Sequence, residues 1–280
     1  MRAAAVAAAL LLWPADAPLP EGNAYVRGLV EKQRHREEIL DQYTYDLASV
    51  REDLDEAGRV KERETRRYEI FFVKGRPVRR LVEEDGRPLS AARQQREDRE
   101  AREMAEAVRS GRAVTEQPRV RLSAILDRYD FRAVAREDVA GRTAIVLEFQ
   151  PRPGDLGLEG DRYLRRLGGR IWVDEAEQEV VRTEITNLAA IKVGSVLGAS
   201  VSSLSTRIDF RKVDDAVWLP AEDETLVSGR ALIFKKFRRR FRRTYGNYRR
   251  FSVESTESRS PIPSPSPSPF PLSLIHAYTF

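Results

Sequence analysis

The residues best suited to binding chemistry lie in one stretch, KKFRRRFRRTYGNYRRF, which runs from Lys235 to Phe251 and holds no acid. Arg238, Arg240 and Arg242 occupy alternate positions, so they share one face if the stretch is a strand. Such a row could track nucleic-acid phosphates, lie on an anionic membrane, or form the solvated outer face of a sheet. The rest of the chain has to decide among these three roles.

Thiol and imidazole groups suited to catalysis or metal binding are nearly absent. There is no cysteine, which excludes disulfides, thiol catalysis and thiolate metal sites, and only His35 and His276 could supply imidazole. No G-x-S-x-G, P-loop or H-E-x-x-H motif occurs, and the acidic runs DEAEQE and VREDLDE are typical of charged turns. We therefore expect a protein that is not an enzyme and that has neither a cofactor nor a metal site.

The first residues have the three parts of a secretory signal peptide. In MRAAAVAAALLLWPADAPLP, one arginine precedes an apolar run that is too short to span a bilayer, and Ala15-Asp16-Ala17 is a small-residue cleavage site. We expect residues 1–17 to be removed on export to the periplasm. No cysteine follows the apolar run, so we expect no lipid anchor.

The composition changes again after Glu257. The alternating Ser-Pro that follows favours polyproline II and cannot pair in a sheet, so residues 258–280 are expected to be a disordered tail. Residues 18–257 remain, and 41% hydrophobic content is enough for one extended core. We expect them to form a single domain.

The elements that must position these residues are mostly strands. Helices are expected over 24–42, over 90–109 and within VRLSAILDRY, whereas most of the remaining chain alternates apolar and polar residues with a period of two. Turn signals include Ala140-Gly141 and Asp214-Asp215. Because helices do not alternate with strands, a parallel sheet is not expected. The predicted class is α+β, with a large curved antiparallel sheet, an incomplete barrel, covered on its concave face by two or three helices.

Within this fold the basic stretch is interpreted as part of two closing strands, 230–244 and 248–255, which turn at Gly246-Asn247. The aromatic residues would face in, and Arg238, Arg240 and Arg242 would face out. A solvated strand face is the favoured interpretation, and an anionic membrane surface is the next. Nucleic acid is disfavoured as a partner because exported proteins rarely meet it.

The apolar face of the sheet predicts either a lipid-sized cavity or a packed core. Residues spaced by two, or by a multiple of two, keep their side chains on one face of a strand. The nearly uncharged segment 188–204 is either a buried strand pair or an adaptable loop at the cavity mouth. The candidates to line the cavity are Ile145, Leu147, Phe149, Leu204, Ile208, Phe210, Phe237 and Phe241.

Two phrases of the sequence, GRIWVDEAEQEVVRTEI and DFRKVDDAVWLPAEDE, are similar to strand pairs of the outer-membrane lipoprotein-sorting superfamily of LolA and LolB. The resemblance extends in topology over residues 24–257, and it transfers no binding residue to this chain. It implies an incomplete barrel closed by helices and a non-catalytic carrier whose partners are acyl chains or lipoproteins. Related folds also serve as periplasmic stress-signalling sensors, so the alternative is a protein-binding regulatory module without a lipid cargo.

Overall fold

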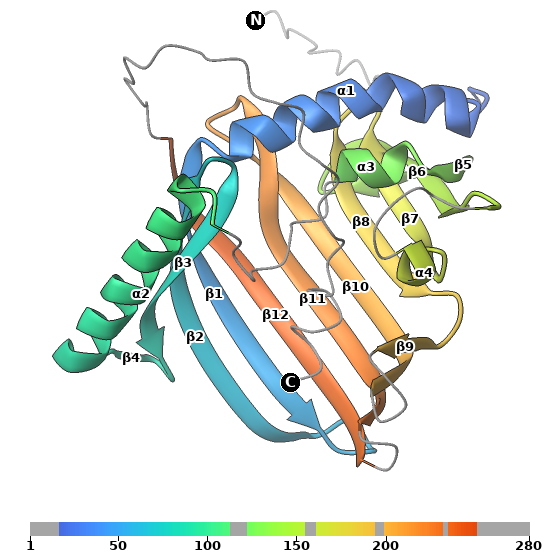
Figure 1. Ribbon diagram of the computed structural model, residues 1–280. Helices are drawn as coiled ribbons and strands as arrows, with labels where there is room; N and C mark the ends of the chain where they lie inside the picture. The colour runs from blue at the N-terminus through green and yellow to red at the C-terminus, as the bar shows by residue number, and fades with distance from the viewer. Residues whose placement is uncertain (1–16, 113–121, 155–160, 194–198, 232–234, 251–280) are drawn as a thin grey trace, which may run out of the picture.

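The computed structural model describes residues 17–112, 122–154, 161–193, 199–231 and 235–250 (Figure 1). Nearly all of the predicted signal peptide and the whole predicted Ser/Pro tail lie outside these residues. The helices are α1 (Gly22–Leu40), α2 (Ala91–Arg109), α3 (Leu122–Leu126) and α4 (Asp161–Leu164). The strands are β1 (Tyr43–Leu54), β2 (Val60–Val73), β3 (Arg76–Glu84), β4 (Arg87–Pro88), β5 (Tyr129–Val139), β6 (Arg142–Pro151), β7 (Leu167–Asp174), β8 (Val180–Asn187), β9 (Ile191–Val193), β10 (Ala199–Val213), β11 (Val217–Ala231) and β12 (Lys235–Arg250).

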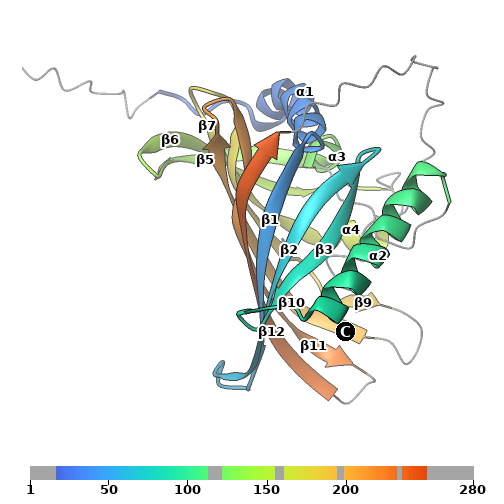
Figure 2. The ribbon, with the colours of Figure 1, turned by 90° about the vertical axis from the view of Figure 1, so that its left-hand side faces the viewer.

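All described strands belong to one antiparallel sheet, in the order β4-β3-β2-β1-β12-β11-β10-β8-β7-β6-β5, with β9 paired to β10. Strand β12, the last of the described strands in sequence, lies between β1 and β11 in the sheet. The order starts at β4 and ends at β5, so the described sheet is open, and Figure 2 shows how strongly its strands curve. This architecture confirms the predicted α+β class with a large curved antiparallel sheet.

Short hairpins carry the turns that the sequence predicted. Ala140 and Gly141 join β5 to β6 with φ of 53° and 81°, and Asp214 and Asp215 join β10 to β11 with φ of 51° and 52°. Two successive positive φ angles match the right-handed twist of antiparallel strands, which is why Gly, Asp and Asn are common at such positions. Both predicted hairpins are therefore confirmed.

The predicted turn at Gly246-Asn247 is wrong. Strand β12 runs unbroken from Lys235 to Arg250. In the ladder between β12 and β1, Thr44 pairs with Arg249 and Asp46 pairs with Gly246. An advance of two residues on β1 therefore corresponds to three residues on β12. One extra residue on β12 is thus absorbed as a bulge, and Asn247 adopts its positive φ of 50° there. The strand that precedes β12 in sequence and pairs with it is β11.

Helix α1 lies across one end of the strands and defines the inner face of the sheet (Figure 1). Its N-cap is Glu21, whose carboxylate accepts hydrogen bonds from the backbone N–H groups of Asn23 and Ala24 at 3.1 and 2.6 Å. Val26 and Leu29 enter the main hydrophobic cluster, which also includes residues from α3 and α4. Three helices therefore pack on the inner face.

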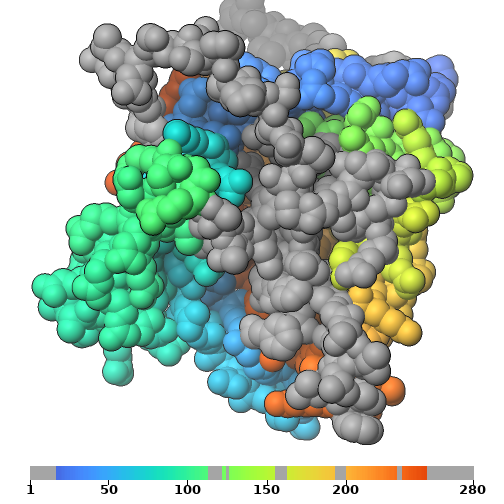
Figure 3. All heavy atoms as spheres, in the orientation of Figure 1, coloured from blue at the N-terminus to red at the C-terminus, as the bar shows by residue number. Residues whose placement is uncertain are grey.

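Helix α2 packs on the other face at the β2–β3 edge. Its buried residues Ala101, Ala105 and Val108 contact Val78, which pairs with Phe71. Side chains alternate along a strand, so this face of β2 is opposite to the one that meets α1. Ser90 is the N-cap, and its hydroxyl accepts a hydrogen bond from the backbone N–H of Arg93 at 3.4 Å. Figure 3 shows α2 projecting from the side of the molecule.

Candidate functional site

A hollow of about 190 Å³ lies between α1 and the inner face of β8, β10, β11 and β12. Leu40, Ile208, Phe210 and Leu219 contribute apolar walls, and Arg36 places its guanidinium 4.7 Å from the centre of the Phe210 ring. Small-molecule sites in proteins usually enclose about 300–1,000 Å³. The hollow is therefore smaller than a site for a long acyl chain.

Two acidic groups at this hollow are already engaged by the protein itself. Glu37 accepts hydrogen bonds from the backbone N–H and the hydroxyl of Ser123 at 3.0 and 2.6 Å. Asp223 accepts from Arg243 at 2.9 Å and from the Tyr245 hydroxyl at 2.7 Å. Burial, reinforced by the nearby Asp223 charge, raises the pKa of Tyr245 well above its usual value, so this hydroxyl remains a donor.

One polar group at the hollow is unsatisfied. Thr183 is only 3% exposed, and its hydroxyl has no hydrogen-bond partner among the described residues. A buried hydroxyl without a partner is unfavourable by roughly 1–3 kcal/mol. The hollow thus has apolar walls and a single spare hydroxyl.

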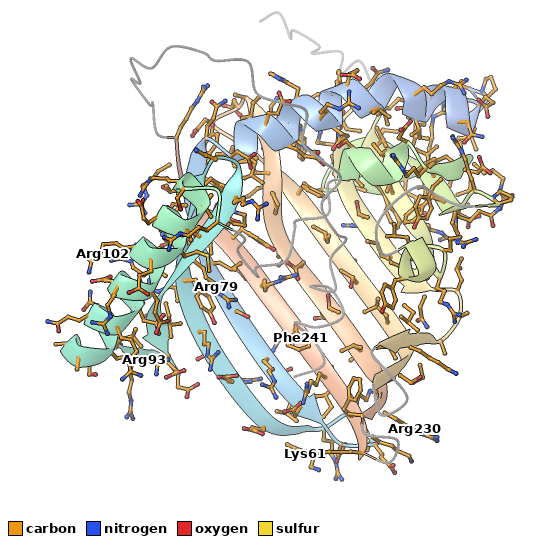
Figure 4. The ribbon with its side chains drawn as sticks, in the orientation of Figure 1. Lys61, Arg79, Arg93, Arg102, Arg230 and Phe241 are labelled. Atoms are coloured by element: carbon orange, nitrogen blue, oxygen red, sulfur yellow. The ribbon has the colours of Figure 1, made fainter. Side chains whose placement is uncertain are left out.

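Most of the predicted cavity residues lie inside a packed cluster. Ile145 and Leu147 are fully buried, and Phe149, Leu204 and Phe241 are at most 7% exposed in the same cluster. Phe237 packs against that cluster from a partly buried position, and Figure 4 shows Phe241 near the middle of the sheet.

Of the eight candidates, only Ile208 and Phe210 line the hollow. In the segment 188–204, Ile191 and Val201 are buried in the β9–β10 pair. Residues 194–198 between these strands lie outside the described part.

Where β1 and β2 extend beyond α1, the inner face carries charged side chains. Arg51 pairs directly with Phe241 across the β1–β12 ladder and therefore shares its face. Arg51 contacts Asp53 at 3.0 Å and Glu64 at 3.7 Å, and Arg239 contacts Asp53 at 2.7 Å. We call Arg51, Asp53, Glu64 and Arg239 the inner charged patch. The sequence signal for this patch is the charged residues at inward-facing positions of β1. They were not among the predicted site residues.

Arg238, Arg240 and Arg242 lie on the outer face, as predicted. Two of them, Arg240 and Arg242, donate hydrogen bonds to the carboxylate of Glu52. Glu52 is buried, and its carboxylate accepts hydrogen bonds from Arg240 at 3.3 Å, from Arg242 at 3.0 Å and from Arg63 at 2.9 and 2.5 Å. Burial acts to raise the pKa of Glu52, but the hydrogen bonds and charges of these guanidiniums outweigh it and keep the pKa below its usual value. Arg238 instead donates to the backbone carbonyl of Glu56 at 3.5 Å.

Charges of alternating sign cross the outer face from β5 to β12. Each residue of this row is the direct partner of the next in the ladder, and the ion pairs of Glu148 with Arg132 and Arg170 measure 2.6 and 2.8 Å. Opposite charges on neighbouring strands stabilise a sheet. The row consists of Arg132, Glu148, Arg170, Glu184, Arg207, Glu224 and Arg242.

The described residues contain no group of three or more His, Cys, Asp or Glu side chains that could hold a metal ion. None of the helices in the described ranges is long and apolar enough to cross a membrane.

Several solved structures are similar to this chain, each at low identity. A domain described as an outer membrane lipoprotein-sorting protein from Vibrio parahaemolyticus is 10% identical, with a TM-score of 0.41 over 84% of this chain and 94% of that one. A LolA superfamily protein from Nitrosomonas europaea is 13% identical, with a TM-score of 0.37 over 81% and 94%. The MucA/MucB complex of Pseudomonas aeruginosa gives 13% identity and a TM-score of 0.22 over 80% and 99%.

No curated protein sequence matches the chain. The model of the MucB/RseB N-terminal domain, however, matches residues 57–207, which is more than half of the 280 residues. That stretch runs from the β1–β2 turn into β10 and so includes most of the sheet described above. The expected resemblance to the lipoprotein-sorting superfamily is confirmed at the level of the fold, and the chain belongs to the MucB/RseB N-terminal domain family.

Proposed function

We propose that this chain is a protein-binding regulatory module that is exported, non-catalytic and without a lipid cargo. The observation that carries the proposal is the inner charged patch. An acyl chain is held by burial against apolar surface and offers no hydrogen bonds, so it would strip water from Arg51, Asp53 and Glu64 without replacing it. A polypeptide brings charged side chains and backbone groups of its own, which can replace that water.

The packing of the apolar half of the inner face supports the same conclusion. Ile145 and Leu147 have no exposed surface left for a ligand, and the hollow under α1 measures only about 190 Å³. A long acyl chain could enter only if α1 or the strands moved apart. Membership of the MucB/RseB family supports the regulatory alternative that the sequence resemblance implied.

The site of action that we propose is the periplasm. The support is the secretory character of residues 1–17. We further propose that residues 18–257 are the functional domain and that residues 258–280 are a tail.

A lipid or lipoprotein carrier is the second candidate. The observation that favours it is the apolar wall of the hollow, to which Ile208 and Phe210 contribute. In that case the packed residues around Leu147 would have to separate when cargo enters.

A photocrosslinking experiment in the source organism separates the two functions. The photoreactive amino acid p-benzoylphenylalanine is placed at Ser49, which pairs with Arg243 on the inner face. The matched control carries it at the neighbouring Ala48, an exposed residue on the outer face. Mass spectrometry then identifies what is attached.

We expect a polypeptide adduct at Ser49 that is absent at Ala48. A lipid adduct at Ser49 would instead support the carrier. If neither position gave an adduct, or if both gave the same proteins in the same amounts, the inner charged patch would not be a binding surface. A fluorescent fatty-acid titration of the purified protein should show no saturable binding.

A further inference from the structure

Positive charge gathers at the end of the sheet that lies away from α1. The β1–β2 and β11–β12 hairpins meet there, because Lys236 contacts the Glu56 carboxylate at 3.0 Å and Arg238 contacts its backbone carbonyl. Figure 4 shows Lys61 and Arg230 at this end. We call the cations of residues 55–62, 230–231 and 235–238 the basic end, and they are Arg59, Lys61, Arg230, Lys235, Lys236 and Arg238.

The charge at the basic end is accessible and in excess. Residues 55–62, 230–231 and 235–238 hold six Lys or Arg and three Asp or Glu, a net charge of +3, against +5 for the whole chain. Lys61, Arg230 and Lys235 are exposed, and the side chains of Arg59 and Lys236 are 82% and 67% exposed. By contrast, the charges between β5 and β12 alternate in sign, so the excess is local.

An exposed apolar side chain lies among these cations. Val60 is 45% exposed and sits between Arg59 and Lys61. Basic residues beside exposed apolar ones match the bilayer interface, where phosphates attract the cations and the acyl boundary accepts the apolar group. A ligand that offers only anionic groups would satisfy the cations but would leave Val60 exposed to water.

We propose that the basic end docks the protein on the surface of an anionic lipid membrane, through the headgroup phosphates. The cations of both strand pairs lie at the same end of the sheet, so both sets can touch one plane. The outer-face residues Arg240 and Arg242, held by Glu52, contribute less than the basic end. This role is independent of the proposed protein partner, and failure of one leaves the other intact.

The test uses the purified protein and vesicles of phosphatidylglycerol mixed with phosphatidylcholine. The variant is Lys61→Gln with Arg230→Gln and Lys235→Gln, all exposed residues whose loss should leave the thermal midpoint unchanged. Each cation near an anionic surface contributes about 1 kcal/mol, so the affinity should fall about 100-fold. The matched control makes the same change in charge on α2, with Arg96→Gln, Arg99→Gln and Arg102→Gln (Figure 4).

We expect wild type and the α2 control to bind these vesicles equally, with binding that weakens from low to high salt. Pure phosphatidylcholine vesicles should not bind. Equal binding to neutral vesicles, no binding by wild type, or an equal loss in the α2 control would each overturn the proposal. Poly-glutamate is the competing probe, and binding to it without binding to anionic vesicles would assign the basic end to an acidic polypeptide.

Discussion

Replacing Glu52 by Gln should destabilise the fold because it removes a buried carboxylate that three arginines share. The change keeps the size of the side chain but removes the one negative charge shared by Arg63, Arg240 and Arg242. These arginines come from the strands on either side of β1, so the carboxylate joins β2, β1 and β12. In the variant, three guanidiniums repel one another across the middle of the sheet.

The magnitude follows from the burial of the partners. Removing one partner of a fully buried ion pair destabilises a protein by about 3–5 kcal/mol, and exposed pairs contribute about 0–1 kcal/mol. Glu52 is 1% exposed, but the side chains of Arg240, Arg242 and Arg63 are 33%, 45% and 55% exposed and stay partly hydrated. We therefore expect a loss of about 2–3 kcal/mol in the free energy of unfolding at neutral pH.

The effect should depend on pH in one direction. Because the pKa of Glu52 is lower in the folded state than its usual 4.5, its contribution to stability is fully present above about pH 4.5. That contribution is lost as the pH falls through the folded-state pKa, when wild type also carries a neutral side chain. The difference between wild type and Glu52→Gln should therefore be largest at neutral pH and shrink in acid.

Urea unfolding followed by circular dichroism at neutral and acidic pH measures both quantities. The control is Glu222→Gln, which removes an exposed carboxylate from the same outer face and should change stability by less than about 0.5 kcal/mol. If Glu52→Gln were no more destabilising than this control, or if its effect persisted unchanged in acid, the shared carboxylate would not stabilise the sheet.

Four further substitutions probe the packing of the inner face, each measured by urea unfolding. Leu147→Glu places a carboxylate where no surface is exposed, so it should cost several kcal/mol and unfold the protein, whereas a folded variant would indicate an open cavity. Gly169→Ala should cost about 1–3 kcal/mol because its new Cβ would lie 1.9 Å from a backbone oxygen of β8. Thr183→Val should leave the free energy of unfolding unchanged or raise it, because the Thr183 hydroxyl has no partner among the described residues. Thr206→Val should lower it by about 1 kcal/mol, because the change breaks a buried hydrogen bond with Thr225. Equal effects of the two substitutions would contradict this reasoning.

The local features of the fold could be predicted from the sequence because each depends on neighbouring residues. Alternation with a period of two identified the strands, and the pairs Ala140-Gly141 and Asp214-Asp215 marked hairpins through their backbone preferences. The same preference misled at Gly246-Asn247. A positive φ suits a bulge as well as a turn, and only the ladder between β12 and β1 decides which one forms.

The charge arrangement of the outer face could not be predicted because it depends on register. Arg132, Glu148 and Arg170 come from three strands, and their neighbourhood exists only in the folded sheet. The sequence did predict that Arg238, Arg240 and Arg242 face outward. It did not reveal that two of them are held by Glu52.

The inner face shows why the alternation of side chains along a strand was not enough to determine the function. Alternation assigns a residue to a face, but it does not say whether a helix, a ligand or solvent covers that residue. In β1, the inward-facing Tyr45 and Leu47 belong to the cluster that meets Leu40 of α1, whereas Arg51 and Asp53 farther along form ion pairs. At about 1.5 Å per residue, the 19 residues of α1 extend only roughly 28 Å, across one end of the strands. The change from apolar to charged residues within one strand therefore marks where α1 stops covering the sheet, and the surface beyond that point is the one we assign to a polypeptide partner.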